Sequence, residues 1–440
     1  MIGRRGFLGT GAMAAAALLA PGRALALLQE RSFGSPAATS PFPPEVYRER
    51  RQRLMAQMKT GVAVVFAAAA VDRTAPVAGQ DSDFSYLTGI QDEAGAALVL
   101  APAERTYREF LFLALRNPEE ERYEGVRLAL NQSLRDRTGF ERLGRMNRLG
   151  RTVVDLASRS GELHYLGPLA DPDAPVPPAL ELYSKVAARV PGTRIVNSHN
   201  LIRRMRMVKE PRELELIRQA IAATERGLSA GIRAARPGMR EFELRTIIEA
   251  EFRAAGARGL AFPSIVGTGP NSAVLHYTGS DAVIRAGDLI LCDVGAAVGG
   301  YAADITRTFP VDGRFTAEQR QVYDVVLKAQ ESALGTLRAG AVYEDVQDRA
   351  RETIRAAGHI DDFWHGLGHF VGLEVHDAGN YAAPLPAGAV VTVEPGIYLP
   401  ERGFGIRIED DYLVTPRGWE HLSRGVPRRA EEIEALRRAG

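Results

Sequence analysis

Residues 287–309 read GDLILCDVGAAVGGYAADITRTF, two apolar runs on either side of a pair of glycines. Val298-Gly299-Gly300 is typical of a tight turn, so the segment predicts a β-hairpin with strands over 287–295 and 301–309. If the chain turns at Val298-Gly299, Asp293 and Asp304 are cross-strand partners with Cβ atoms about 5 Å apart. Like charges at such positions destabilise a sheet unless a metal joins them.

The next candidate ligand lies in HGLGHFVGLEVHD (365–377), where three histidines crowd a segment interrupted by glycines. This spacing of glycines predicts that the segment is not a regular helix throughout. Histidine is the commonest neutral metal ligand and the commonest general acid or base. We therefore expect one of these rings to bind metal and the others to hold substrate.

Two further acidic residues follow strand-like patterns. Glu394 comes after the run VVTV (390–393) and before Pro395-Gly396, which predicts a position at the end of a strand. Glu409 lies in GIRIEDD (405–411), where alternation places it on the same face as Arg407.

Together these segments supply four carboxylates and one imidazole. If they converge, the carboxylates repel one another, and two divalent cations would cancel their four negative charges. The pattern predicts a dinuclear hydrolytic site in which a metal-bridging hydroxide is the nucleophile. The candidate ligands are Asp293, Asp304, His369, Glu394 and Glu409.

In these motifs the sequence resembles the pita-bread metallopeptidases, family M24B, in particular the Xaa-Pro aminopeptidase (aminopeptidase P) branch. The blocks that carry the resemblance occur in order, LHYTG (275–279), DVGA (293–296), ADITRTFP (303–310), HGLGHFVGLEVHD (365–377), VEPGIY (393–398) and GIRIEDD (405–411). Upstream, SDFSYLTG (82–89) resembles an N-terminal segment of the same branch, although the family usually has tryptophan where this chain has Ser85.

The resemblance implies a role for each site residue. Asp293 would bind one metal, Asp304 and Glu409 would bridge both, and His369 and Glu394 would bind the second. Glu394 would also carry the proton from water to the leaving nitrogen. The remaining residues would act on substrate or on their neighbours: His276 and His376 at the scissile carbonyl, Arg407 near Glu409, and His365 orienting the groups around it.

The cofactors implied are two divalent metal ions, usually Mn²⁺ in this family. A donor set of oxygens with one nitrogen suits manganese, yet Co²⁺, Fe²⁺ and Zn²⁺ stay open because affinity favours the later transition metals. The partners are peptides with proline at the second position, and the family's habits make a homodimer or homotetramer plausible.

Three functions are compatible with the motifs. The first is hydrolysis of the N-terminal Xaa-Pro bond of a peptide. The second is a prolidase, an Xaa-Pro dipeptidase, but prolidases usually carry an arginine-containing insertion, and residues 378–393 contain neither Arg nor Lys. The third is a non-catalytic pita-bread binding module, which the presence of all five ligands disfavours.

The predicted fold is α/β (α+β), with an N-terminal creatinase-like α/β domain before a C-terminal pita-bread domain. A chain of 440 residues, 45% hydrophobic, can bury two cores. Pro211 near the start of a long amphipathic pattern marks the second domain. The predicted boundaries are a signal peptide at 1–26, a flexible tether at 27–44, the N-terminal domain at 45–208 and the catalytic domain at 209–440.

The N-terminal residues predict export. Arg4-Arg5 precedes an apolar run at 12–20 and the sequence Ala24-Leu25-Ala26, which fits a twin-arginine signal with a cleavage site. The apolar run is too short to span a membrane as a helix of about 20 residues. We therefore expect a periplasmic or extracellular protein with no stable membrane span after processing.

The other charged and polar features have simpler interpretations. A net charge of +1 argues against nucleic-acid binding, so the basic runs at 48–53 and 203–206 are interpreted as solvated helix faces. Cys292 is the only cysteine, so no intrachain disulfide can form, and we expect it to pack as a small apolar residue.

Overall fold

The computed structural model describes residues 40–71, 79–169 and 171–440. The signal peptide predicted at 1–26 and all but the last five residues of the predicted tether lie outside these ranges. The described chain forms two compact units, of which the larger comprises Ala38–Leu115 and Leu130–Gly440. In the smaller, Arg116–Ala129, the short helix α4 (Glu121–Glu124) is tied back to Arg116 by two hydrogen bonds from its guanidinium to Glu121, at 2.7 and 2.8 Å.

Within the larger unit, the N-terminal segments build a six-stranded mixed sheet in the order β4-β3-β2-β1-β5-β6. Its strands contain the short apolar runs that the sequence shows before residue 200. They are β1 (Val62–Phe66), β2 (Ala97–Leu100), β3 (Glu109–Leu113), β4 (Arg142–Arg145), β5 (Glu162–Tyr165) and β6 (Arg194–Asn197).

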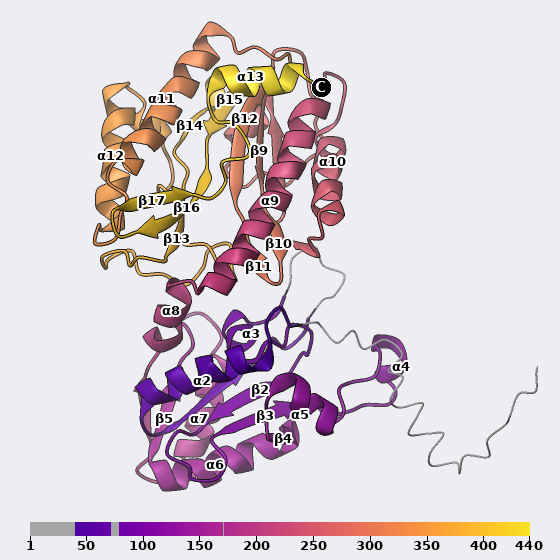
Figure 1. Cartoon of the computed structure of the whole chain (residues 1–440), viewed down its shortest axis with the longest axis vertical. Coiled ribbons are helices and arrows are strands. Elements are labelled where there is room, and N and C mark those ends of the chain that lie inside the picture. The colour runs from indigo at the N-terminus through magenta and orange to yellow at the C-terminus, as the bar shows by residue number, and fades with distance from the viewer. Residues whose placement is uncertain (1–39, 72–78, 170) are drawn as a thin grey trace, which may run out of the picture. The chain divides into compact units, whose positions relative to one another are not determined.

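Helices lie on both faces of this sheet (Figure 1). Leu149 and Val153 of α6 and Tyr183 of α7 pack against Val62 and Val64 of β1 in one buried cluster. The alternate residues of β1 are also buried, as expected for a strand covered on both sides. The helices are α2 (Pro44–Met58), α3 (Ser82–Thr88), α5 (Gln132–Thr138), α6 (Leu149–Ser160), α7 (Pro178–Ala187) and α8 (Asn200–Met207).

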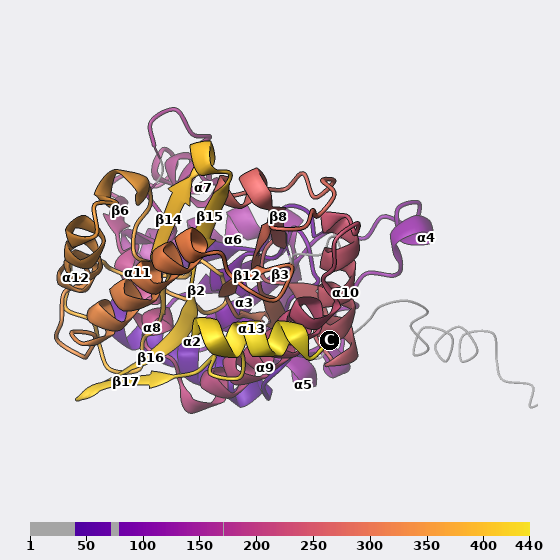
Figure 2. The same cartoon turned by 90° about the horizontal axis from the view of Figure 1, so that it is seen from above.

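The C-terminal segments surround several small antiparallel sheets with long helices. In both views α9 and α10 lie on one side of these strands and α11 and α12 on the other (Figures 1 and 2). Pro211 begins α9, as the sequence indicated, and Glu210 and Glu213 form a reciprocal capping box there. The helices are α9 (Pro211–Ala234), α10 (Glu241–Ala254), α11 (Ala317–Leu334), α12 (Tyr343–Ala356) and α13 (Ala430–Arg438).

The strands of this half pair in four groups, β12-β9-β8, β11-β10-β7, β13-β16-β17 and β14-β15. Their bounds are β7 (Gly259–Leu260), β8 (Ile265–Thr268), β9 (Leu289–Val294), β10 (Ala296–Val298), β11 (Tyr301–Ala302), β12 (Ile305–Pro310), β13 (Val390–Val393), β14 (Gly396–Leu399), β15 (Phe404–Arg407), β16 (Asp410–Thr415) and β17 (Gly418–His421). The predicted mixture of helices and strands is confirmed.

The hairpin forms, but its predicted register is wrong by two residues. Val298 pairs with Tyr301, so the turn is Gly299-Gly300, and Asp293 pairs with Thr306. Both glycines have positive φ, +60° and +89°, which two consecutive turn residues of this type require. Asp304 lies between β11 and β12, diagonal to Asp293 and on the same face.

The interpretation of both basic runs as solvated helix faces is wrong for three of their arginines. Arg50 and Arg51 of α2 are only 1% and 0% exposed, and Arg206 of α8 is buried as well. Arg50 contacts Glu210 and Glu213 at 3.2 and 3.4 Å. The net charge of the chain does not reveal this burial, because the carboxylate that pairs with each guanidinium lies far away in the sequence.

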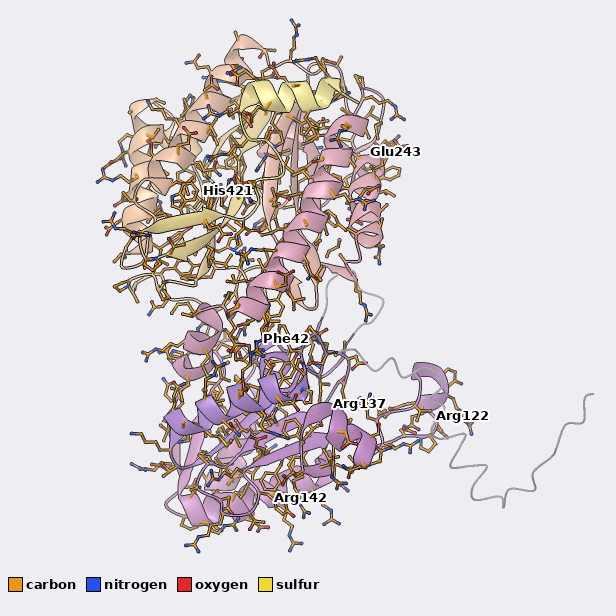
Figure 3. The ribbon with its side chains drawn as sticks, viewed as in Figure 1. Phe42, Arg122, Arg137, Arg142, Glu243 and His421 are labelled. Carbon is orange, nitrogen blue, oxygen red and sulfur yellow. The ribbon has the colours of Figure 1, made fainter. Side chains whose placement is uncertain are left out.

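Aromatic packing joins the first described residues to the C-terminal half. Phe42, labelled in Figure 3, lies with its ring centroid 6.1 Å from both Tyr47 and Tyr301. Tyr301 donates a hydrogen bond to Glu213 at 2.7 Å. Phe42 belongs to the predicted tether, and the contacts of Arg50 with Glu210 and Glu213 show that the two predicted domains also share buried contacts. Their boundary at 208/209 stays a prediction.

Cys292 is fully buried in β9 and is a free thiol, as expected. Burial raises the pKa of this thiol, and the neighbouring Asp293 raises it further. Among the helices in the described ranges, none combines the length and the apolar character that crossing a bilayer requires.

Candidate metal centre

One cavity of about 580 Å³ gathers all nine site residues that the sequence singled out. They come from the six motif blocks of the C-terminal half quoted above. The members are His276, Asp293, Asp304, His365, His369, His376, Glu394, Arg407 and Glu409. Much of the remaining lining is apolar, with side chains such as Phe262, Ile265 and Val375.

The strands position the acidic residues at, or one residue before, the points where regular pairing stops. Asp293 is the fifth residue of β9, and Asp304 precedes β12. Glu394 follows β13, as predicted, and Glu409 lies in the break between β15 and β16. This break differs from the continuous strand that the alternation at 405–411 predicted.

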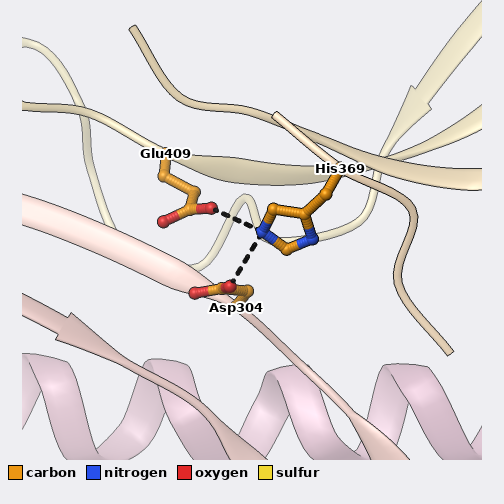
Figure 4. A group of neighbouring side chains, drawn as sticks. All are labelled: Asp304, His369 and Glu409. Carbon is orange, nitrogen blue, oxygen red and sulfur yellow. Dashed lines mark ion pairs between the residues drawn. The ribbon is translucent and has the colours of Figure 1, made fainter. Parts of the chain in front are cut away.

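Three of these residues form the tightest group. One ligand atom from each of Asp304, His369 and Glu409 lies within 4.8 Å of the others (Figure 4). His369 Nε2 is 3.3 Å from Asp304 Oδ2, 3.4 Å from Glu394 Oε1 and 3.8 Å from Glu409 Oε1. The imidazole thus faces a ring of carboxylate oxygens.

His369 is neutral in this environment. Burial, together with the nearby ring of His376 whose centroid is 4.1 Å away, lowers its pKa to about 4. Because Nδ1 faces the carbonyl oxygen of Phe370 at 3.3 Å, the neutral ring carries its proton there and presents the Nε2 lone pair to the carboxylates. Acceptors facing acceptors require a cation between them.

The carboxylates of the cavity also indicate that a cation binds between them. Burial raises the pKa of Glu394 to about 8, and it raises the pKa values of Asp304 and Glu409 well above their usual range. Neighbouring carboxylates add to each of these increases.

Three buried oxygens in this cavity have no hydrogen-bond partner among the described residues, namely Asp293 Oδ1, Asp304 Oδ1 and Glu409 Oε1. Burying acceptors without partners is costly. Hard carboxylate oxygens with one imidazole nitrogen are suitable ligands for divalent cations. The residues present therefore fit a metal centre.

Arg407 is held firmly at one side of the cavity. Its guanidinium donates to Asp293 Oδ2 at 2.6 Å, to the Tyr398 hydroxyl at 2.8 Å and to Thr306 Oγ1 at 3.3 Å. Tyr398 in turn lies 2.7 Å from His365 Nε2. Burial and Arg407 lower the pKa of His365 to about 4, so this ring is neutral.

Sequence reasoning missed the hydroxyl groups that fix the ligands. Thr306 donates to Glu409 Oε2 at 2.6 Å, and the backbone N–H of His369 donates to Thr392 Oγ1 at 3.0 Å. Tyr398 and Thr306 lie inside the motifs VEPGIY and ADITRTFP, so the signal was present. Their roles become visible only when the strands are placed side by side.

Ser85 does not line this cavity. It is buried in α3, where its hydroxyl faces the carbonyl oxygen of Ile90 at 3.5 Å.

Two family models match the chain, metallopeptidase family M24 over residues 215–416 and the aminopeptidase P N-terminal domain over residues 47–164. The Xaa-Pro aminopeptidase of Escherichia coli K12 is 36% identical over 429 residues, covering 89% of this chain and 97% of the relative. The chain belongs to metallopeptidase family M24. The resemblance to the Xaa-Pro aminopeptidase branch, with its pita-bread fold, is confirmed.

The M24 chain is also similar to a solved zinc-substituted aminopeptidase P from Escherichia coli in complex with product. That structure is 33% identical, covers 90% of this chain and 99% of its own, and has a TM-score of 0.80. By contrast, an Xaa-Pro dipeptidase from Pyrococcus furiosus, 37% identical, matches only 51% of this chain and 65% of its own.

Proposed function

We propose that this chain is a metal-dependent aminopeptidase that hydrolyses the N-terminal Xaa-Pro bond of peptides. The observation that carries the proposal is the single cavity in which four carboxylates surround the neutral imidazole of His369. Similarity to an Xaa-Pro aminopeptidase over 89% of the chain supports the choice of substrate.

Two divalent cations at this centre would polarise the scissile carbonyl and lower the pKa of water. The chain's own residues would hold them: Asp293 on one ion, Asp304 and Glu409 between the two, and His369 and Glu394 on the other. The buried acceptors without partners support this assignment of ligands.

The remaining groups would handle protons and substrate. Glu394, whose pKa burial raises to about 8, is suited to take a proton from water and pass it to the leaving proline nitrogen. That nitrogen belongs to a tertiary amide without N–H. The site therefore cannot hold the scissile amide through an N–H donor and must hold it through its carbonyl oxygen. The exposed rings of His276 and His376 face the cavity and would donate to the carbonyl oxygen.

The lining favours peptides longer than two residues. A dipeptidase must neutralise the substrate's free carboxylate, and Arg407 is the only lysine or arginine among the described residues that line this cavity. Its guanidinium is already bound to Asp293 and Tyr398. Peptides whose carboxylate extends beyond the cavity avoid this requirement.

The deciding experiment compares Xaa-Pro dipeptides with matched Xaa-Pro-Yaa tripeptides on the manganese-loaded protein. We expect kcat/KM at least tenfold higher for tripeptides, a difference of about 1.4 kcal/mol in transition-state binding. Preference for dipeptides would make the chain a prolidase, and absence of cleavage of both would refute the proposal.

We also propose manganese as the native metal, because hard oxygen donors dominate the site. The test measures the metal content of protein isolated without added metal, together with turnover after reloading with Mn²⁺, Co²⁺, Fe²⁺ or Zn²⁺. Isolation with stoichiometric zinc, and full turnover only with zinc, would contradict this proposal.

The twin-arginine motif at Arg4-Arg5 supports a proposal that the chain is exported to the periplasm or beyond. Cell fractionation should recover the protein outside the cytoplasm, and the double change of Arg4 and Arg5 to lysine should retain it inside. Equal distributions for both forms would contradict export by this route.

Family precedent alone supports self-association as a homodimer or homotetramer. Sedimentation of the purified protein over a range of concentrations would test it, with a monomer at all concentrations as the opposing result.

A further inference from the structure

A buried group of charges lies outside the cavity, between the N-terminal and C-terminal halves. Arg206 of α8 donates to Asp83 of α3 at 2.7 Å and also to Asp377, which directly follows the cavity residue His376. Lys209 donates to the other oxygen of Asp377 at 2.8 Å. Arg206, Lys209 and Asp377 are all at most 7% exposed.

The group sets two cations, Arg206 and Lys209, against the carboxylates of Asp83, Asp377 and Glu374. Burial by itself would raise the pKa of Asp377, yet Lys209 and Arg206 together lower it, so its carboxylate stays ionised. Glu374 lies 3.4 Å from Arg206 at the exposed side of the group. Arg206 thus binds carboxylates from two regions more than 250 residues apart in sequence.

Asp377 is also fixed by its own backbone and by close packing. Its N–H donates to the carbonyl oxygen of Phe370 at 2.8 Å, which closes the loop that carries His376. A Cβ at Gly372 would lie 2.0 Å from Asp377 Oδ2, so the carboxylate fills the space beneath the loop. The loop is therefore held at its base by this carboxylate and the cations around it.

The same loop is tied to the strands that carry the metal ligands. The N–H of Ala302 donates to the carbonyl oxygen of Gly372 at 2.8 Å, and Val371 N–H donates to Val390 of β13. His376 itself is exposed to the cavity, and its ring makes no hydrogen bond to another of the described residues. Apart from its contact with the His369 ring, whose centroid lies 4.1 Å away, the position of His376 then depends on the loop.

We propose that Asp377 and Arg206 are positioning residues that set the place of His376, and that Asp83 extends this control to the N-terminal sheet domain. The inference rests on the proposed function insofar as His376 acts on substrate. It also gives the N-terminal motif SDFSYLTG a role, because its Asp83 accepts a hydrogen bond from Arg206, which also binds Asp377 of the C-terminal half.

Arginine is required here because its planar fork can bind two carboxylates at once, whereas a lysine ammonium cannot span the same pair. Arg206→Lys should therefore give only partial function. Asp83→Asn, which keeps the shape but loses one charge, should have a smaller effect of the same sign.

The first test compares Asp377→Asn with Glu109→Gln. Glu109 pairs with the buried Arg51 at 2.7 Å in the N-terminal domain, so the control also removes one carboxylate charge from a buried arginine. In the metal-loaded protein we expect Asp377→Asn to lower kcat by about tenfold to a hundredfold with KM changed less than about threefold, because small displacements near reacting atoms are costly. Glu109→Gln should change neither by more than about twofold, although both variants should lower Tm.

The second test is a double-mutant cycle with His376→Ala. If Asp377 acts through His376, Asp377→Asn should change kcat/KM by less than about threefold once the ring is absent. An unchanged tenfold or larger loss in the His376→Ala background would overturn the proposal, as would a lowered metal content in Asp377→Asn.

A third measurement does not depend on hydrolysis. Amide hydrogen exchange of residues 370–378 should accelerate in Asp377→Asn and Arg206→Met but not in Glu109→Gln. If the wild-type protein cleaved no Xaa-Pro peptide, the proposed function would fail while this measurement still decided the positioning. Equal exchange in all variants would refute it.

Discussion

At the level of single residues, Glu394 combines two requirements that conflict. It must be ionised to bind a cation and protonated at some moment to release the leaving group. Burial raises its pKa to about 8, so both forms are accessible near neutral pH. Thr392 Oγ1 at 3.4 Å and His369 at 3.4 Å are its nearest polar neighbours.

We predict that Glu394→Gln abolishes turnover while leaving substrate binding largely intact. The amide keeps the shape but cannot carry the proton, and loss of a general base typically costs about 10²–10⁴-fold in kcat. Steady-state kinetics, with an inhibitor titration for binding, would measure this. A variant with near-normal kcat would remove Glu394 from proton transfer.

We predict that the metal-free protein loses stability as pH rises from about 6.5 to 8. A carboxyl whose folded pKa is raised binds its proton more tightly when folded, so its stabilising effect is complete below the unfolded pKa of about 4.3 and disappears as pH passes the folded value. His365 and His369, with pKa lowered to about 4, act in the opposite direction only below about 6.5, where their unfolded forms are charged.

The measurement is Tm against pH with and without Mn²⁺. Because metal competes with protons for the same oxygens, the gain in Tm on adding Mn²⁺ should be larger at pH 8 than at pH 6.5. Glu394→Gln should flatten the metal-free curve. A metal-free Tm that rose over this interval would contradict the assignment.

The sequence was sufficient to predict nine of the residues that line the cavity, because motif order and flanking residues identify each of these nine. It failed for Arg50, Arg51 and Arg206, which are buried. An arginine on a helix shows no periodic signal of burial when its partners, such as Glu210 or Asp377, lie elsewhere in the chain. The hydroxyls of Thr306 and Tyr398 escaped prediction for the same reason.

At the level of elements, the hairpin of β9 to β12 shows what pattern alone cannot fix. Its strands and glycine turn were predicted, but a shift of the turn by one residue moves the register by two. The interruptions at Gly295 and at Ala303-Asp304 take Asp304 out of the regular ladder. Interrupted pairing leaves a carboxylate free to turn towards the cavity.

We predict that Gly295→Ala disturbs the metal centre. A Cβ at this position would lie 2.0 Å from the carbonyl oxygen of Ala303 and 2.8 Å from the Phe262 ring, so the backbone between Asp293 and Asp304 must move. The cost should be about 1–3 kcal/mol of stability, with a weaker metal affinity.

Gly418→Ala in β17 is the matched control, because nothing lies within 4 Å of its added Cβ. Metal titration by calorimetry and urea unfolding would compare the two variants. Equal metal affinity in both would show that the hairpin tolerates the displacement.

At the level of the larger unit, two buried charge groups connect its N-terminal and C-terminal halves. One joins Arg50 to Glu210 and Glu213, and the other joins Arg206 to Asp83 and Asp377. Breaking a buried pair by removing one partner typically costs about 3–5 kcal/mol, a large part of a domain's stability.

We therefore predict that residues 209–440 expressed alone are insoluble or melt at least about 10 °C below the full chain. Calorimetry of both proteins would test this, and the full chain should unfold in one transition. A fragment that melted at the temperature of the intact protein would show that the halves are energetically independent.

The single thiol of Cys292 offers a way to observe these events without adding any label. It is buried in the strand that carries Asp293, and its raised pKa keeps it protonated and unreactive. Alkylating reagents should therefore modify the protein only when β9 opens. The rate of that single modification, followed by mass spectrometry, would record how often the centre of the sheet comes apart under native conditions, and how far bound metal slows it.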